Sequence, residues 1–201
     1  MSTARLENRG AAMESMGWHS LVHSLLMVRD HDYLSAFYAV SSLWDYMAIM
    51  AIAVLALVTL DRRYSMALSM TLIATAVCEA MKRVIREPRP VPPWPHVERL
   101  GHGMPSLHSC TGFAIAAALI SEVFRVQRPL RWRRAVIALL LAATQAYGRW
   151  YNRYHTIEQV LAGTVVGLLL SAAMLGGPGR KIAVRLRQLL DAIFELAHSW
   201  L

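Results

Sequence analysis

The sequence predicts an all-α fold, a polytopic membrane bundle of about five transmembrane helices (six at most) with an N-terminal amphipathic surface helix. Hydrophobic residues make up 56% of the 201 residues and charged residues only 17%, whereas a soluble domain carries roughly 25% charged residues. The apolar residues gather into five long runs, and a membrane-spanning helix needs about 20 such residues. These observations exclude a disordered chain and disfavour a water-soluble globule.

The chain divides into four segments. Residues 1–12 are polar, and residues 13–34 place apolar side chains at helical spacing, which predicts an amphipathic interfacial helix. We expect no cleaved signal peptide, because the first long apolar run starts too late. Residues 35–176 form the transmembrane core, and residues 177–201 form a basic tail that is also amphipathic.

Five apolar runs give the predicted spans of the core, which cover residues 35–60, 64–85, 106–126, 134–151 and 156–175. Asp45 interrupts the first run, and Glu79 lies near the end of the second. A charge at the bilayer centre costs about 2.5–3.5 kcal/mol on insertion scales, so it usually has a partner. Glu79 is followed at helical spacing by Lys82 and Arg83. No partner of Asp45 is visible in the sequence, so a packing role and a site role are both open.

The excess of positive charge is the second feature of the composition. The net charge is +8 at pH 7, from 21 Lys and Arg against 13 Asp and Glu. Basic chains often bind nucleic acid, but beside these apolar runs the charge indicates an anionic partner in or next to a bilayer. We therefore expect a membrane and a lipid as partners and no nucleic acid; the oligomeric state is open. The two cysteines, Cys78 and Cys110, lie inside apolar runs and predict core residues, not disulfides or zinc ligands.

Three polar clusters lie at the ends of the predicted helices, at residues 82–90, 103–109 and 148–159, all on one side of the membrane. Each alone has an ordinary explanation. Lys and Arg extend to the membrane interface, Pro105 and Ser106 are common at a helix start, and His155 with Gln159 is an i,i+4 pair. His108 alone would be a hydrogen-bonded interfacial histidine. The meeting of all three clusters on one face favours a site.

These residue types suit phosphoryl transfer without a metal. The reaction needs cations on the phosphate oxygens, an in-line nucleophile and a proton for the leaving oxygen. Lys and Arg supply charge, the Arg fork binds two oxygens, and a helix N-terminus adds free N–H groups. One imidazole can attack phosphorus while the other donates a proton near neutral pH. The acidic residues are scattered, so we expect no metal and no cofactor.

Lys82-x6-Arg89-Pro90, Pro105-Ser106-x-His108 and Arg149-x5-His155 resemble, in order and spacing, the three signature motifs of the type-2 phosphatidic acid phosphatase superfamily. The resemblance covers roughly residues 35–175 and implies a metal-independent lipid phosphatase, usually with a six-span core. It implies that His155 is the nucleophile, forming a phosphohistidine, and that His108 is the general acid. The residues that it implies for phosphate binding are Lys82, Arg89, Ser106, Leu107 and Arg149.

Three positions differ from the usual family pattern. Leu107 stands where the second motif usually has Gly, and Gly148 stands where Ser usually precedes the Arg of the third. Gln159 replaces an Asp four residues after the histidine. A Gln oxygen can accept from the ring of His155 and fix its tautomer, but it cannot stabilise an imidazolium as a carboxylate would. We interpret Gln159 as orienting His155, and Glu79 either as orienting Lys82 from a second layer or as an ordinary i,i+3 pair.

The segments at residues 87–90 and 154–163 resemble the dolichyl-diphosphatase branch, which implies hydrolysis of the terminal phosphate of a polyprenyl (dolichyl or undecaprenyl) diphosphate. Two alternatives use the same scaffold: a lipid phosphotransferase, because Pro-Ser-Leu-His also resembles those enzymes, and a phosphatase of phosphatidic acid, phosphatidylglycerol phosphate or lipid A. A third, from another class, is a non-enzymatic haem-binding module using His108 and His155. Haem ligands, however, normally lie on apolar helix faces.

Lys and Arg are divided almost equally between the two sides of the predicted topology. If Lys82, Arg89 and Arg149 are set aside as site residues, the side opposite the three motifs is the more basic one. The positive-inside rule then makes that opposite side cytoplasmic. We therefore expect the site on the non-cytoplasmic face, in the ER lumen or the periplasm.

Overall fold

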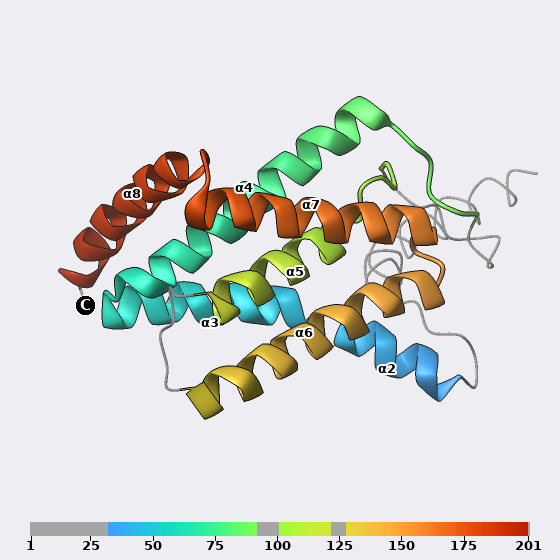
Figure 1. Ribbon diagram of the computed structural model, residues 1–201, viewed down its shortest axis with the longest axis horizontal. Helices are drawn as coiled ribbons and strands as arrows, with labels where there is room; N and C mark the ends of the chain where they lie inside the picture. Colours follow the sequence, from blue (N-terminus) through green and yellow to red (C-terminus); the bar gives the residue numbers. More distant parts are fainter. Residues whose placement is uncertain (1–31, 92–100, 122–127, 201) are drawn as a thin grey trace, which may run out of the picture.

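The computed structural model describes residues 32–91, 101–121 and 128–200, and this part of the chain is helical and contains no strand (Figure 1). The helices are α2 (Tyr33–Ser41), α3 (Trp44–Thr59), α4 (Arg62–Ile85), α5 (Leu107–Ile120), α6 (Arg128–Tyr151), α7 (Ile157–Gly176) and α8 (Arg180–His198). The predicted all-α membrane bundle is confirmed. The predicted interfacial helix falls almost wholly outside the described residues, and the four-segment division stays a prediction.

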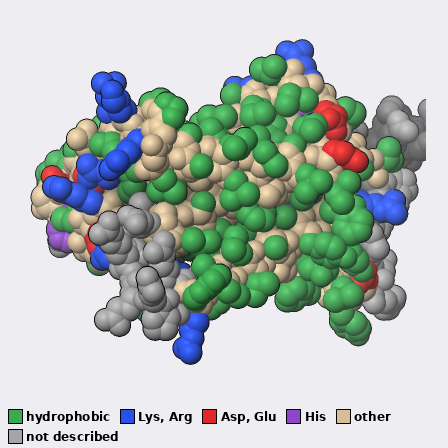
Figure 2. All heavy atoms as spheres, viewed as in Figure 1, with side chains coloured by type: hydrophobic (Ala, Val, Ile, Leu, Met, Phe, Trp, Pro, Cys, Tyr) green, Lys and Arg blue, Asp and Glu red, His purple; other side chains and the backbone are tan. Residues whose placement is uncertain are grey.

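The outer surface of the bundle is apolar. Hydrophobic side chains are spread across the face seen in Figure 2, and large ones such as Met47, Leu140 and Leu169 are exposed. Among the described helices, three are long and apolar enough to cross a membrane: Tyr33–Thr59 taken as one span, Arg62–Ile85 and Ile157–Gly176. The helix α5 is apolar but has only 14 residues, and α6 has 24 residues with Arg in its first turn. The chain is an integral membrane protein.

Successive helices from α4 to α7 run in opposite directions, so that α4 and α6 end where α5 and α7 begin (Figure 1). The helix α5 lies at the centre and contacts α3, α4, α6 and α7. Its buried positions are mostly small residues, such as Cys110, Ala114 and Ala118. Small residues let helix backbones approach closely in a membrane. Cys78 and Cys110 are buried free thiols, as predicted.

The helices α5 and α7 touch through their backbones. A Cβ atom on Gly163 would overlap the carbonyl oxygen of Ser106, and one on Gly167 would overlap that of Cys110. The two glycines are four residues apart and share one face of α7, as in other small-x3-small contacts between membrane helices. This contact fixes the start of α5 against the start of α7.

The first predicted span is interrupted between α2 and α3, which the sequence did not indicate. The Ser42 carbonyl accepts a hydrogen bond from Nε2 of Gln145 at 3.0 Å, and Nε1 of Trp44 donates to Oε1 of Gln145 at 2.8 Å. Backbone groups freed by a break need partners inside a bilayer, and Gln145 on α6 supplies one. Because of the break, α2 packs on α6 while α3 packs on α4, α5 and α8.

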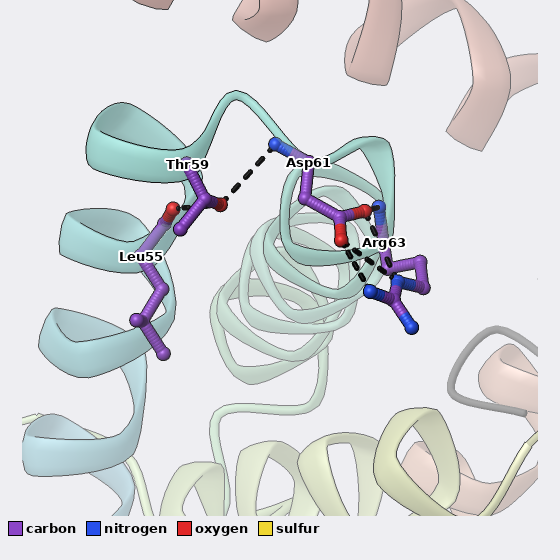
Figure 3. Close-up of polar contacts among 4 residues, drawn as sticks. All are labelled: Leu55, Thr59, Asp61 and Arg63. Atoms are coloured by element: carbon purple, nitrogen blue, oxygen red, sulfur yellow. Dashed lines mark hydrogen bonds and ion pairs between the residues drawn. The ribbon is translucent and has the colours of Figure 1, made fainter. Parts of the chain in front are cut away.

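The turn between α3 and α4 lies at the end of the bundle opposite the motifs (Figure 1), and Figure 3 shows its polar contacts. Leu60 has a left-handed backbone with φ of 50°. Asp61 caps α4 by accepting from the Arg63 N–H at 2.9 Å, and its carboxylate pairs with the Arg63 guanidinium at 2.5 Å. The Thr59 hydroxyl donates to the Leu55 carbonyl at 2.6 Å. The turn is therefore held by its own side chains.

The tail helix α8 packs on α4, α3 and α7. Ala183, Leu190 and Phe194 belong to its packed face, and Arg187 pairs with Asp191 at 2.5 Å. Another of its faces exposes apolar residues, Ile182, Leu189, Ile193 and Leu196. The tail is thus helical and divided into packed, apolar and basic faces.

Candidate active site

The three motifs meet at one end of the bundle, as the topology predicted. Lys82 lies in the last turn of α4 and Arg149 in the last turn of α6, and both are buried. His108 lies in the first turn of α5, and His155 directly precedes the cap of α7. Arg89 follows α4. Each imidazole lies within electrostatic range of all three cations, Lys82, Arg89 and Arg149.

A tight turn between α6 and α7 holds the third motif. The Arg149 carbonyl accepts from the N–H groups of Tyr154 at 2.9 Å and of His155 at 3.2 Å. Arg153 has a left-handed backbone with φ of 54°, which lets the chain reverse. The Arg149 guanidinium carbon lies 3.8 Å from the centre of the Tyr154 ring, a cation–π contact. The five-residue spacing therefore fixes this arginine relative to the histidine.

The structure gives a physical reason for Gly148 at the position before Arg149. A Cβ atom there would lie 2.9 Å from Cβ of Tyr38 on α2. Nearby, Nδ2 of Asn152 donates to the Ser35 carbonyl at 3.1 Å, and the Ser35 hydroxyl donates to Oδ1 of Asn152 at 2.8 Å. The helix α2 is thus fastened to the turn that carries His155, and a side chain at position 148 would push it away.

The two arginines have unused hydrogen-bonding capacity. Within the described residues, the buried Nε atoms of Arg89 and Arg149 have no hydrogen-bond partner. Desolvation lowers the pKa of Arg89, although a guanidinium stays protonated in proteins. A buried donor without a partner costs roughly 1–3 kcal/mol. Two such donors on cations suit an anion with several oxygen acceptors, as a phosphate has.

The second motif begins α5. Ser106 is buried at the N-cap, and its backbone N–H donates to the Gln159 carbonyl at 2.9 Å. The Ser106 hydroxyl accepts from that of Ser109 at 3.1 Å and makes no capping bond. The first N–H groups of a helix have no partner inside it, so those near Leu107 are suited to an anion. The His108 ring meets the Tyr46 ring edge-on, with centroids 5.4 Å apart.

The predicted pair of Glu79 and Lys82 is present, with 3.4 Å between Oε1 and Nζ. The Glu79 side chain is 42% exposed, whereas that of Lys82 is 9% exposed. The pair is therefore partly solvated on the acidic side, and its strength is modest. The contact fits both interpretations of Glu79, an ordinary i,i+3 pair and an orienting group.

Asp45, which had no visible partner in the sequence, lies beside the site. It is buried in the first turn of α3, and Oδ2 accepts from the Thr111 hydroxyl at 2.9 Å. Thr111 lies on α5 one turn beyond His108. Asp45 is also within electrostatic range of Arg149. Sequence reasoning missed this contact, because 66 residues separate Asp45 from Thr111.

Gln159 is the centre of a hydrogen-bond network at the start of α7. Its Oε1 lies 3.1 Å from Nδ1 of His155, which is the contact predicted from the sequence. Oε1 also accepts from the Thr156 N–H at 3.3 Å, and the Thr156 hydroxyl accepts from the Gln159 N–H at 3.3 Å, so the two residues form a capping box. That box is visible in the sequence as Thr-x-x-Gln and was missed.

The other end of the Gln159 amide contacts the first motif. Nε2 donates to Oε1 of Glu87 at 2.7 Å and to the Pro88 carbonyl at 2.9 Å. Gly103 packs against this amide, since a Cβ there would lie 2.5 Å from Nε2, and its N–H donates to the Glu87 carbonyl at 2.7 Å. Sequence reasoning gave Glu87 no role, although it lies within the first motif.

The electrostatics favour a neutral His155. Burial, and then the charge of Arg149, hold the pKa of His155 well below its usual range, and the hydrogen bond to Gln159 opposes them. In the described ranges, no three His, Cys, Asp or Glu side chains are grouped as metal ligands would be.

Fold and geometry together define a polytopic helical membrane protein in which three cationic side chains and two histidines come together at one end of the bundle. The profile of the PAP2 superfamily matches residues 62–182, more than half of the chain. The chain belongs to the PAP2 superfamily, as the motifs predicted.

One curated relative is dolichyldiphosphatase 1 from Dictyostelium discoideum, 31% identical over 97 residues. The match covers 45% of this chain and 41% of that relative, so the chain spans less than half of its length. No solved structure matches the chain significantly.

Proposed function

We propose that the protein is a membrane lipid phosphatase that removes the terminal phosphate of a polyprenyl diphosphate, dolichyl or undecaprenyl, through a phosphohistidine and without a metal. One observation carries this proposal: Lys82, Arg89 and Arg149 all lie within electrostatic range of two histidines at one end of the bundle. The family and the similarity to a dolichyldiphosphatase support a lipid phosphate as substrate.

In the first step, Nε2 of His155 attacks the terminal phosphorus, and the bond from phosphorus to the bridging oxygen breaks. His108 donates its proton to that oxygen, so the lipid monophosphate leaves. In the second step, water attacks the phosphohistidine while His108 takes a proton from it. The P–N bond breaks, inorganic phosphate leaves, and both histidines return to their starting states.

The cations have one task in both steps. Lys82, Arg89 and Arg149, with the Ser106 hydroxyl and the free N–H groups of the first turn of α5 around Leu107, neutralise the phosphate oxygens, whose charge must be met in the transition state. The lowered pKa of His155 supports its role, since only the neutral ring has a lone pair for attack. Burial of the cations keeps this electrostatic contribution large.

We propose that the site faces the non-cytoplasmic side. The opposite end exposes Arg62 and Arg63 at the start of α4 and Arg180 and Lys181 at the start of α8. A cytoplasmic excess of Lys and Arg is the usual topology signal. Reporter fusions at the end of α8 test this: activity of a cytoplasm-specific reporter supports the orientation, and activity of a reporter specific for the other side contradicts it.

A substrate panel tests the function. The purified protein is given undecaprenyl and dolichyl diphosphates, phosphatidic acid, phosphatidylglycerol phosphate and lipid A, each with and without EDTA. We expect fastest phosphate release from a polyprenyl diphosphate, no effect of EDTA, and no turnover by His155→Ala. His198→Ala, which changes an exposed histidine on α8, is the matched control and should stay active.

A different result would overturn each part of the proposal. Preference for another lipid overturns the substrate, EDTA inhibition overturns the metal-free mechanism, and an active His155→Ala overturns the nucleophile. An acceptor lipid can be added to the same assay. If it takes up phosphate and less free phosphate is released, the protein is a phosphotransferase. A Soret band without any phosphate release would favour the haem-binding alternative.

A further inference from the structure

The amide of Gln159 connects the imidazole of His155 to the carboxylate of Glu87. Oε1 of Gln159 lies 3.1 Å from Nδ1 of His155, and Nε2 lies 2.7 Å from Oε1 of Glu87. The carboxylate comes from the segment that follows α4, and 72 residues separate it from Gln159. A carboxylate is therefore one amide away from the histidine, in a chain that lacks the usual Asp at position 159.

The partners of the amide fix its orientation. The Glu87 carboxylate and the Pro88 carbonyl can only accept hydrogen bonds, so the NH2 group must face them. The Thr156 N–H can only donate, so the amide oxygen must face it. This oxygen then also faces Nδ1 of His155, which must carry the proton. The lone pair is consequently on Nε2, the nitrogen that remains for attack on phosphorus.

The surroundings of His155 make a negative charge important. Lys82 on α4, Arg89 after it, Arg149 on α6 and the second imidazole, His108 on α5, all act on the ring. When Nε2 bonds to phosphorus, the ring gains positive charge among these cations. A neutral amide can orient the ring but cannot offset that charge. Glu87 can, because its charge polarises the amide toward the ring.

We propose that Glu87 is the positioning residue that supplies, through Gln159, the negative charge that an Asp at position 159 would give directly. The inference rests on the proposed phosphohistidine chemistry. The role belongs to the side chain alone, since the backbone of Glu87 has a separate task in accepting from the Gly103 N–H. A substitution that keeps the shape of this side chain and removes its charge therefore isolates the effect.

The first experiment is Glu87→Gln, which keeps an oxygen acceptor for Nε2 of Gln159. We expect kcat to fall at least tenfold with KM changed less than threefold, because the charge acts on the reacting ring. The acid limb of the pH profile should move to lower pH, because loss of a negative charge lowers the pKa of His155 further. Glu195→Gln, on the exposed side of α8, is the matched control and should change neither.

The second experiment repeats Glu87→Gln in the Gln159→Asp background. A carboxylate then contacts the ring directly, so the loss of Glu87 should cost less than threefold instead of at least tenfold. An equal loss in both backgrounds would overturn the inference, since Glu87 would then act independently of Gln159. The helix content of every variant is checked by circular dichroism.

A third measurement separates this inference from the proposed function. Titration of His155 by 15N NMR needs no substrate, and Glu87→Gln should lower its pKa. If the wild-type protein releases no phosphate from the panel, the proposed function fails and this titration decides the inference alone. An unchanged pKa, or activity of Glu87→Gln within twofold of the wild type, overturns the role of Glu87.

Discussion

Replacing Gly163 by alanine tests whether the contact between α5 and α7 sets the geometry of the site. The new Cβ would overlap the Ser106 carbonyl oxygen, which belongs to the backbone and cannot rotate away. The two helices must therefore separate. Because His108 lies in the first turn of α5 and His155 directly precedes the N-cap of α7, a separation of the helices moves the two imidazoles apart.

The change in folding free energy caused by Gly163→Ala is the balance of two opposing contributions. Overpacking typically costs about 1–3 kcal/mol, while alanine in a helix regains about 1 kcal/mol over glycine. The net loss of folding free energy is then at most about 2 kcal/mol, or a fall of less than about 8 °C in melting temperature for a chain of this size. A displacement of about 1 Å at a reacting centre can lower the rate about 100-fold. We therefore expect a small loss of stability and a large loss of kcat.

The assay compares phosphate release and thermal unfolding in detergent for Gly163→Ala and Gly176→Ala. Gly176 ends the same helix, and a Cβ there would meet no heavy atom within 4 Å. The control should keep wild-type activity and stability. A Gly163→Ala protein with kcat within twofold of the wild type would refute the idea that this backbone contact holds the histidines in place.

Three further predictions concern other positions. Arg149→Lys keeps the charge but loses the planar fork and the contact with Tyr154, so kcat/KM should fall about 10- to 100-fold. The lowered pKa of His155 places the acid limb of kcat/KM below pH 6.5. The free energy of unfolding, measured by denaturation, should fall as pH drops below about 6.5, because there only the unfolded chain takes up a proton at His155. Asp61→Ala removes the cap of α4, which should cost about 1 kcal/mol in unfolding experiments with activity unchanged.

Two of the spans and the meeting of the motifs at one end of the bundle could be predicted from the sequence. The predicted spans 64–85 and 156–175 differ by at most two residues from α4 and α7, because charged residues and a glycine-rich turn mark their ends. Placing the motifs at helix ends of alternating direction brings them to one face. The contact between His155 and Gln159 was predicted as a helical i,i+4 pair; the contact is present, although His155 lies before the N-cap of α7 and not on the helix.

Contacts between distant segments could not be predicted. The break after Ser41 depends on Gln145, about 100 residues away, which supplies a hydrogen-bond donor that no local pattern announces. Asp45 and Thr111 are likewise paired across two helices. Glu87 contacts Gln159 because the segment after α4 meets the start of α7, 72 residues further along the chain. Spacing rules predict contacts between residues of one helix, whereas each of these contacts joins residues of two different segments.

The break between α2 and α3 lets the two halves of one predicted span support different parts of the candidate site. Before the break, Ser35 on α2 exchanges hydrogen bonds with Asn152 in the turn that carries His155. After the break, Asp45 in the first turn of α3 accepts from Thr111 on α5, and the Tyr46 ring meets the His108 ring edge-on. The Ser42 carbonyl at the break is itself bonded to Gln145 on α6. A displacement of this joint would therefore disturb the supports of both histidines together.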